Sequence, residues 1–110
     1  MGYDVSFRGS FKVSPDMAAK HVATIRKQMK ANDRCDWILS VDGTKVGWNG
    51  YEKFNDYLNQ LNFTINLFKP LGYKLNGMVA WEGEERGDYG RIVVEDNRVT
   101  TIEATTYDII

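Results

Sequence analysis

The feature that most constrains the fold is an alternation of apolar and polar residues near the start of the sequence. Over residues 3–13 the odd positions are apolar or glycine, and the even positions are polar or charged. Because successive side chains of a strand point to opposite faces of a sheet, this pattern predicts a strand with one buried face. Gly9 and Ser10 mark the point where we expect this strand to bend.

Helical periodicity follows in the next segment. Ser14, Pro15 and Asp16 are residue types that favour a helix N-terminus, and we expect this helix to end near residues 31–33. Its apolar residues recur every three or four positions: Ala18, Val22, Ile25 and Met29.

A second helix is predicted over about residues 50–68. Asn49 and Glu52 have the spacing of a capping box, and apolar residues then keep helical spacing. Pro70 and Gly72 are expected to end this helix, which we predict to be the main one packed on the sheet.

The dipeptide formed by Asp42 and Gly43 predicts a β-hairpin with a two-residue type I′ turn between the two helices. Taken literally, that turn places six residues on one face as three cross-strand pairs: Val41 with Thr44, Leu39 with Val46, and Trp37 with Trp48. A register slip of one residue would turn both tryptophans outward.

Three further strands are expected after the second helix, over residues 73–82, 89–95 and 98–106. Asp96 and Asn97 form a tight turn between the last two, and the three strands should make a meander. The sequence therefore predicts a single α+β domain over residues 1–110. We expect a mainly antiparallel sheet of about six strands with two amphipathic helices, in the order β-α-β-β-α-β-β-β.

Composition limits the classes of function. The 110 residues are 43% hydrophobic with a net charge of −1, which favours a folded core and lacks the basic excess of a dedicated nucleic-acid-binding domain. One cysteine cannot form an intrachain disulfide, and neither a signal peptide nor a membrane span is evident, so we expect a cytoplasmic protein.

The residue inventory argues against catalysis. His21 is the only histidine and has no recognisable nucleophile motif near it, so we expect it at the surface or its boundary. Cys35 has no histidine partner and is interpreted as a buried structural cysteine. One His and one Cys cannot complete a zinc site. The acidic segment of residues 82–88 lacks the twelve-residue calcium-loop pattern, and Arg86 competes with a cation for its carboxylates. No catalytic residue, metal site or cofactor is therefore predicted.

Two groups of residues are candidates for a contact surface. The first is an uncharged amide stripe at helical spacing on the second helix, which suits a partner-facing surface; its members are Asn55, Asn59, Asn62 and Asn66. The second is an acidic loop with two aromatic neighbours that we expect to be exposed; its members are Trp81, Glu82, Glu84, Glu85, Asp88 and Tyr89. A plain solvated surface is the alternative for both groups.

Residues 72–84, with the sequence GYKLNGMVAWEGE, and residues 90–97, with the sequence GRIVVEDN, resemble the carboxyl-terminal part of a family of small uncharacterised phage and bacterial proteins. That family carries a Tyr-x-Leu-Asn-Gly-x-Val-x-Trp-x-Gly-Glu motif followed by a Gly-x-Ile-x-Val strand. The start of the chain is similar to theirs as well. The resemblance implies no activity or catalytic residue, but it implies a phage setting, in which small domains often bind and block a host component.

The leading hypothesis is a non-enzymatic binding module that acts by protein–protein contact, as a phage-encoded inhibitor of a host defence system. The first alternative is a homo-oligomer that sequesters a small ligand or nucleotide through Arg91, Arg98 or the basic first helix. The second alternative is weak nucleic-acid binding through that helix, with Arg26, Lys27, Lys30 and Arg34. No contact with a membrane is expected.

Overall fold

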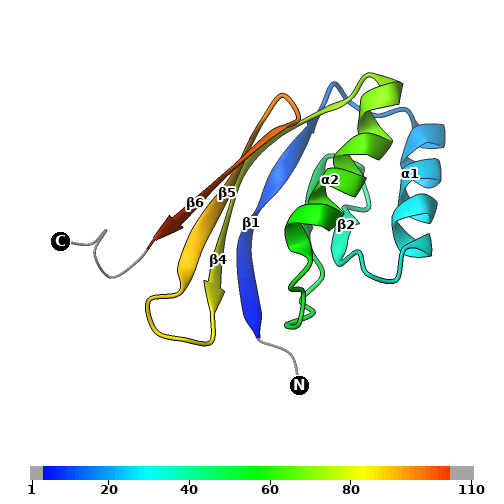
Figure 1. The fold of residues 1–110 in the computed structure, drawn as a ribbon. Helices are drawn as coiled ribbons and strands as arrows, with labels where there is room; N and C mark the ends of the chain where they lie inside the picture. Colours follow the sequence, from blue (N-terminus) through cyan, green and yellow to red (C-terminus); the bar gives the residue numbers. More distant parts are fainter. Residues whose placement is uncertain (1–3, 105–110) are drawn as a thin grey trace.

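The computed structural model describes residues 4–104 as one six-stranded antiparallel sheet with two α-helices (Figure 1). The predicted order of elements is confirmed. In chain order they are β1 (Val5–Ser14), α1 (Ala19–Ala31), β2 (Trp37–Leu39), β3 (Lys45–Trp48), α2 (Tyr57–Phe68), a short 3₁₀ helix η1 (Lys69–Leu71), β4 (Lys74–Gly83), β5 (Tyr89–Glu95) and β6 (Arg98–Ala104). The first and last predicted strands extend at their outer ends beyond the described residues.

Strand β1 lies inside the sheet, whose spatial order is β2-β3-β1-β4-β5-β6. It pairs along its full length with β4 and over a shorter stretch with β3. The meander predicted for the last three strands is confirmed, since β4 pairs with β5 and β5 with β6. The turn at Asp96 and Asn97 gives both residues a positive φ, as a tight two-residue hairpin requires.

The predicted register of the β2–β3 hairpin is confirmed for Leu39 with Val46 and for Trp37 with Trp48. Its turn differs from the prediction, because Gly43 takes a positive φ of 75° while Asp42 does not. The Gly43 N–H donates to the Ser40 carbonyl, so Val41 is part of the turn and is 93% exposed. Val41 therefore does not share the buried face of the hairpin.

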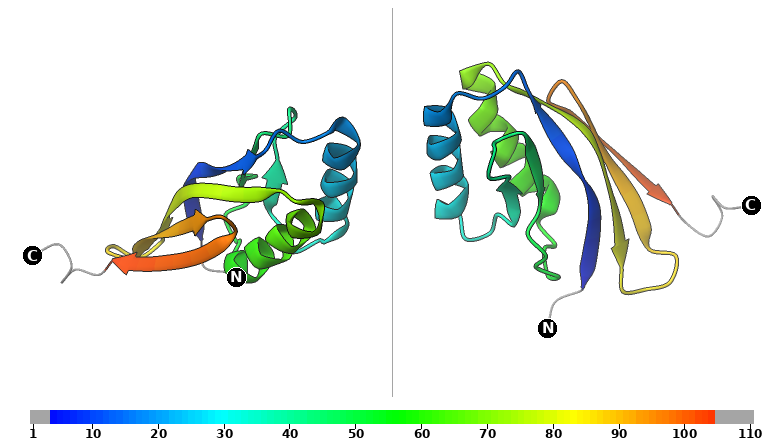
Figure 2. Two further views of the ribbon diagram at one scale, coloured as in Figure 1. Left: turned by 90° about the horizontal axis from the view of Figure 1, so that it is seen from above. Right: turned by 180° about the vertical axis from the view of Figure 1, so that it is seen from behind.

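Both helices lie on the same side of the sheet (Figure 2). Helix α1 buries Val22, Ile25 and Met29, and α2 buries Leu61, Ile65 and Phe68 among others. An aromatic cluster joins this layer to the sheet: the Phe7 ring lies 5.2–5.9 Å from the rings of Trp37, Trp48, Phe54 and Tyr57. Among the described residues, neither helix has the length and apolar content needed to span a bilayer.

Both helices begin later than predicted, because tertiary contacts hold the residues before them. Ser14 stays in β1 opposite Lys74, and the chain runs extended to Ala18, whose N–H donates to the Tyr73 hydroxyl. Before α2, the Asn49 side chain accepts a hydrogen bond from the Tyr51 N–H instead of capping a helix. The Glu52 carbonyl accepts from the Val5 N–H, so residues 50–56 form a turn segment beside the start of β1.

Candidate functional site

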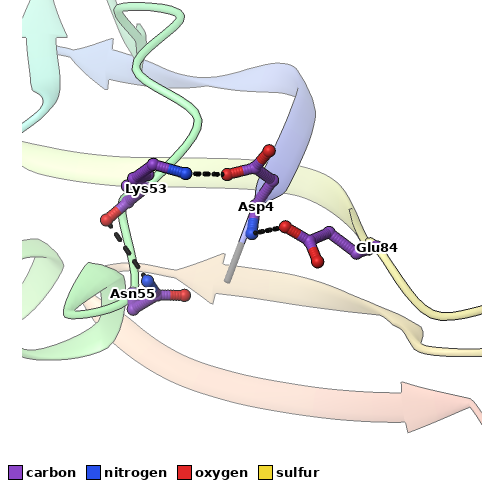
Figure 3. Close-up of polar contacts among 4 residues, drawn as sticks. All are labelled: Asp4, Lys53, Asn55 and Glu84. Carbon is purple, nitrogen blue, oxygen red and sulfur yellow. Dashed lines mark hydrogen bonds and ion pairs between the residues drawn. The ribbon is translucent and has the colours of Figure 1, made fainter. Parts of the chain in front are cut away.

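The acidic loop connects β4 to β5 and is tied to other parts of the fold at its first residues. The Gly83 N–H donates to the Asp88 carbonyl, which closes the loop at 2.7 Å. Outside the loop, a Glu84 carboxylate oxygen accepts a hydrogen bond of 2.7 Å from the Asp4 N–H (Figure 3). Asp4 in turn pairs with Lys53, which lies in the segment before α2. One carboxylate of this loop, that of Glu84, therefore helps to hold the start of β1 in place.

Trp81 is 8% exposed, so the prediction that it is a surface aromatic is wrong. It shares the buried face of β4 with Leu75 and Val79, and its ring lies 6.1 Å from that of Tyr57. Its cross-strand partner is Gly90, where an added Cβ would lie 2.6 Å from the Trp81 Nε1 atom. The indole therefore packs across the glycine, while Tyr89 is half-buried on the opposite face.

The amide stripe is only partly a feature of α2. Asn59, Asn62 and Asn66 are exposed on this helix, whereas Asn55 is exposed in the turn segment before it. The Gln60 amide and the Asn59 amide both donate to the Asp56 carboxylate, at 3.0 and 2.8 Å, and these two bonds lower the Asp56 pKa. The three asparagines of α2 lie on the helix layer. Asn55 instead lies near the acidic loop, because its amide donates to the carbonyl of Lys53, whose side chain pairs with Asp4 beside Glu84 (Figure 3).

Sequence analysis missed a larger surface, the sheet face that points away from both helices, which we call the open face (Figure 2). Strand register defines its members, because alternate residues share one face. One row across four strands contains Arg8, Ala80, Arg91 and Ile102. The next row contains Ile38, Gly47, Ser10, Met78, Val93 and Thr100. Ile38, Met78 and Ile102 are 45%, 48% and 53% exposed.

Basic residues predominate on the open face although the whole chain is slightly acidic. Strand register places six basic residues on this face: Arg8, Lys12, Lys45, Lys74, Arg91 and Arg98. Against them stand Glu82 and Glu95, and Glu82 lies 3.8 Å from Arg8 as an exposed ion pair. An exposed ion pair of this kind contributes about 0–1 kcal/mol to stability.

A hollow of about 400 Å³ lies on the open face. Arg8 and Arg91 flank Ala80, whose small side chain leaves space between them. The rest of the lining is Trp81, Glu82, Tyr89, Gly90 and Ile102. Two of the predicted contact residues, Glu82 and Tyr89, thus belong to the open face, whereas Glu84, Glu85 and Asp88 lie in the loop at its end.

The two residues considered for catalysis have structural contacts. His21 is half-buried, as predicted for the surface boundary, and its Nδ1 atom lies 2.7 Å from the Tyr73 hydroxyl. Cys35 is half-buried rather than fully buried; burial raises its pKa above the ordinary value, and its Sγ atom lies 3.6 Å from the Thr64 hydroxyl. Within residues 4–104, no three His, Cys, Asp or Glu residues are placed to hold a metal ion.

Comparison with known proteins found no matching family model, no matching curated protein and no matching solved structure.

Proposed function

We propose that this protein is a non-enzymatic binding module that contacts another protein through the open face of its sheet. The observation that carries this proposal is the exposure of Ile38, Met78 and Ile102 on a face that neither helix covers. Exposed apolar residues grouped on one surface and bordered by polar residues are typical of protein contact sites. A partner would bury this apolar surface without any rearrangement of the fold.

Charge complementarity favours a partner with an acidic surface. The six basic residues of the open face lie among the apolar ones, and Arg8 and Arg91 border the hollow at Ala80. In this proposal an Asp or Glu side chain of the partner binds Arg91, or Arg8 in exchange for Glu82, because arginine binds carboxylates through paired hydrogen bonds. Such charges contribute mainly to specificity and to the rate of association.

A protein fits this surface better than a nucleic acid does. Proteins that bind single strands stack bases on exposed aromatic rings, whereas the large exposed residues of the open face are aliphatic and Tyr89 is half-buried. Glu84, Glu85 and Asp88, at one end of the face, would also repel a phosphate backbone. The resemblance of residues 72–84 to phage proteins favours a host component as the partner, which the module would block.

The proposal is tested by quantitative affinity capture from a lysate of the host cell with four forms of the protein. Arg91→Glu reverses a charge beside the hollow, and Asn62→Lys changes the amide stripe on α2. Lys20→Glu is the matched control, because it reverses an exposed charge on α1, away from both surfaces. Circular dichroism checks that each form is folded.

We expect the wild type, Asn62→Lys and Lys20→Glu to recover the same stoichiometric partner, and Arg91→Glu to lose at least about tenfold in recovery, equivalent to about 1.4 kcal/mol. If only Asn62→Lys lost recovery of the partner, the contact site would be the amide stripe and the proposed role of the open face would be wrong. Recovery that disappears after nuclease treatment would instead assign the face to nucleic acid.

A further inference from the structure

A second surface lies at the opposite edge of the sheet from β6, as a groove of about 400 Å³ between α1 and β2. Its lining combines buried apolar side chains, such as Met29 and Leu39, with exposed ones. Ile38 is 45% exposed and Val41 is 93% exposed, so the groove is open to solvent along its outer side. This lining is mainly apolar, which suits the side chains of a ligand rather than water.

The outward backbone edge of β2 lies along this groove, where the Trp37 carbonyl accepts a bond of 3.6 Å from the Cys35 thiol and keeps a second lone pair. Strand β2 is the last strand of the sheet on this side and pairs only with β3 among the described strands. The Ser40 N–H donates to the Lys45 carbonyl at 2.8 Å, so the N–H of Ser40 points toward β3, while its carbonyl turns away to accept from Gly43 and Arg26. Alternate residues of an antiparallel strand direct their backbone groups to opposite sides, so those of Trp37 and Leu39 point outward.

The charged residues that line the groove are all basic. Arg26 and Lys30 of α1 line it, and none of the described residues in its lining is acidic. Arg26 donates to the carbonyls of Ser40 and Val41, at 2.6 and 3.2 Å, and so closes one end of the outward edge. Lys30 is exposed in the lining of the groove, beside β2, where its ammonium group attracts a carboxylate.

We infer that this edge binds an extended acidic segment of a partner protein by strand addition. The segment pairs its backbone with Trp37 and Leu39, and one apolar side chain enters the groove against Met29. An acidic residue two positions away lies on the same face of the added strand and reaches Lys30. The pairing edge is only three residues long, so the groove contacts contribute a large share of the affinity. This site shares no lining residue with the open-face hollow and does not depend on it, although Ile38 at the rim of the groove also belongs to the open face.

A displayed library of random peptides, selected on the immobilised wild-type protein, provides the probe. We expect enrichment of sequences with an apolar residue and an acidic residue two positions apart. A synthetic copy of the most enriched peptide is then measured by calorimetry and by amide chemical shifts. We expect its binding to shift the amides of Trp37 and Leu39.

One matched pair of protein variants and one matched pair of methylated peptides distinguish strand addition from other binding. Lys30→Glu should weaken the peptide at least about fivefold, whereas Lys27→Glu, an exposed charge on the same helix outside the groove, should leave it unchanged. Methylation of the peptide backbone nitrogens that face β2 should abolish binding, and methylation of the intervening nitrogens should not, because only the first set donates to the protein.

The inference is overturned if no peptide is enriched, if the selected peptide shifts amides of the open face instead, or if both methylation patterns are tolerated equally. A homodimer in light scattering that Lys30→Glu dissociates would assign the edge to a second copy of this chain and would likewise overturn it. None of these results bears on Arg91, so the open-face proposal stands or fails separately.

Discussion

Asp42 lies at the tip of the β2–β3 connection, where one of its carboxylate oxygens accepts three hydrogen bonds. The donors are the Ser40 hydroxyl and the hydroxyl and N–H of Thr44. These bonds lower the Asp42 pKa from 3.8 to about 2. Because the pKa is lower in the folded state than in the unfolded state, the carboxylate stabilises the fold above about pH 4. That stabilisation is lost as the pH falls to about 2.

We therefore predict that Asp42→Asn is less stable than the wild type at neutral pH, and that the difference shrinks as the pH falls from about 4 to about 2. Urea unfolding across this pH range measures the difference, and carboxyl NMR follows the titration directly. Thr44→Val removes one donor and should raise the Asp42 pKa part of the way back. An ordinary Asp42 pKa in the folded wild type would contradict this interpretation.

Residue type predicted less about the candidate site than strand position did. Trp81 was selected because it is aromatic and precedes an acidic loop, but its place in the alternation with Leu75 and Val79 puts it in the core. Tyr89 begins the next strand with the opposite orientation and reaches the open face. The apolar positions of the strand already alternate through Leu75, Val79 and Trp81, so the burial of Trp81 could have been predicted from the sequence.

Among the elements, β1 and β4 approach so closely at Gly9 and at Gly77 that a side chain would collide with the backbone of the other strand. A Cβ at Gly77 would lie 2.8 Å from the Ser10 carbonyl oxygen, and Gly77 also has a φ of 146°. Gly50 has a similar need for positive φ, at 97°, but no atom lies within 4 Å of its added Cβ. Substitutions at Gly50 and Gly77 therefore separate the cost of backbone strain from the cost of a steric collision.

We predict that Gly50→Ala costs about 1 kcal/mol of unfolding free energy, from strain alone. Gly77→Ala should cost about 3 kcal/mol or more, because the two strands must also move apart. Chemical unfolding of both variants and the wild type provides the comparison. Equal losses would show that the β1–β4 ladder adjusts to a methyl group without cost.

The sequence predicts the ends of the strands better than the N-terminal ends of the helices. The strands follow from the period-two alternation within each segment. The register of Trp37 with Trp48 was predicted correctly, although the turn that joins the two strands is not the predicted type I′ turn. The helix starts depend on distant partners: Tyr73 holds Ala18, and Val5 holds Glu52. No local pattern reports such contacts, so both helices were predicted too long at their N-termini.

For the whole molecule, the order of the strands determines the surfaces. The sequence order of the elements was predictable, but the placement of β1 between β3 and β4 arises from pairings between distant segments. That placement unites Arg8, Arg91 and Ile102 in one row and leaves β2 at an edge. Neither the open face nor the edge groove could therefore be recognised before the strand order was known.

The same placement makes β1 the only strand that joins the β2–β3 hairpin to the β4–β6 meander within the described sheet. Helix α2 reinforces this connection, because Tyr57 carries its ring to Trp81 of β4 while its carbonyl accepts a hydrogen bond from Trp37 of β2. We therefore predict a single cooperative unfolding transition, with coincident midpoints by tryptophan fluorescence and far-ultraviolet circular dichroism. Amides of β1 and β4 should be the most protected from hydrogen exchange, because these are the two central strands of the sheet and they pair with each other along the full length of β1. If the meander instead unfolded in a separate, earlier transition, the two halves would not share one core and the open face would not be a single rigid surface.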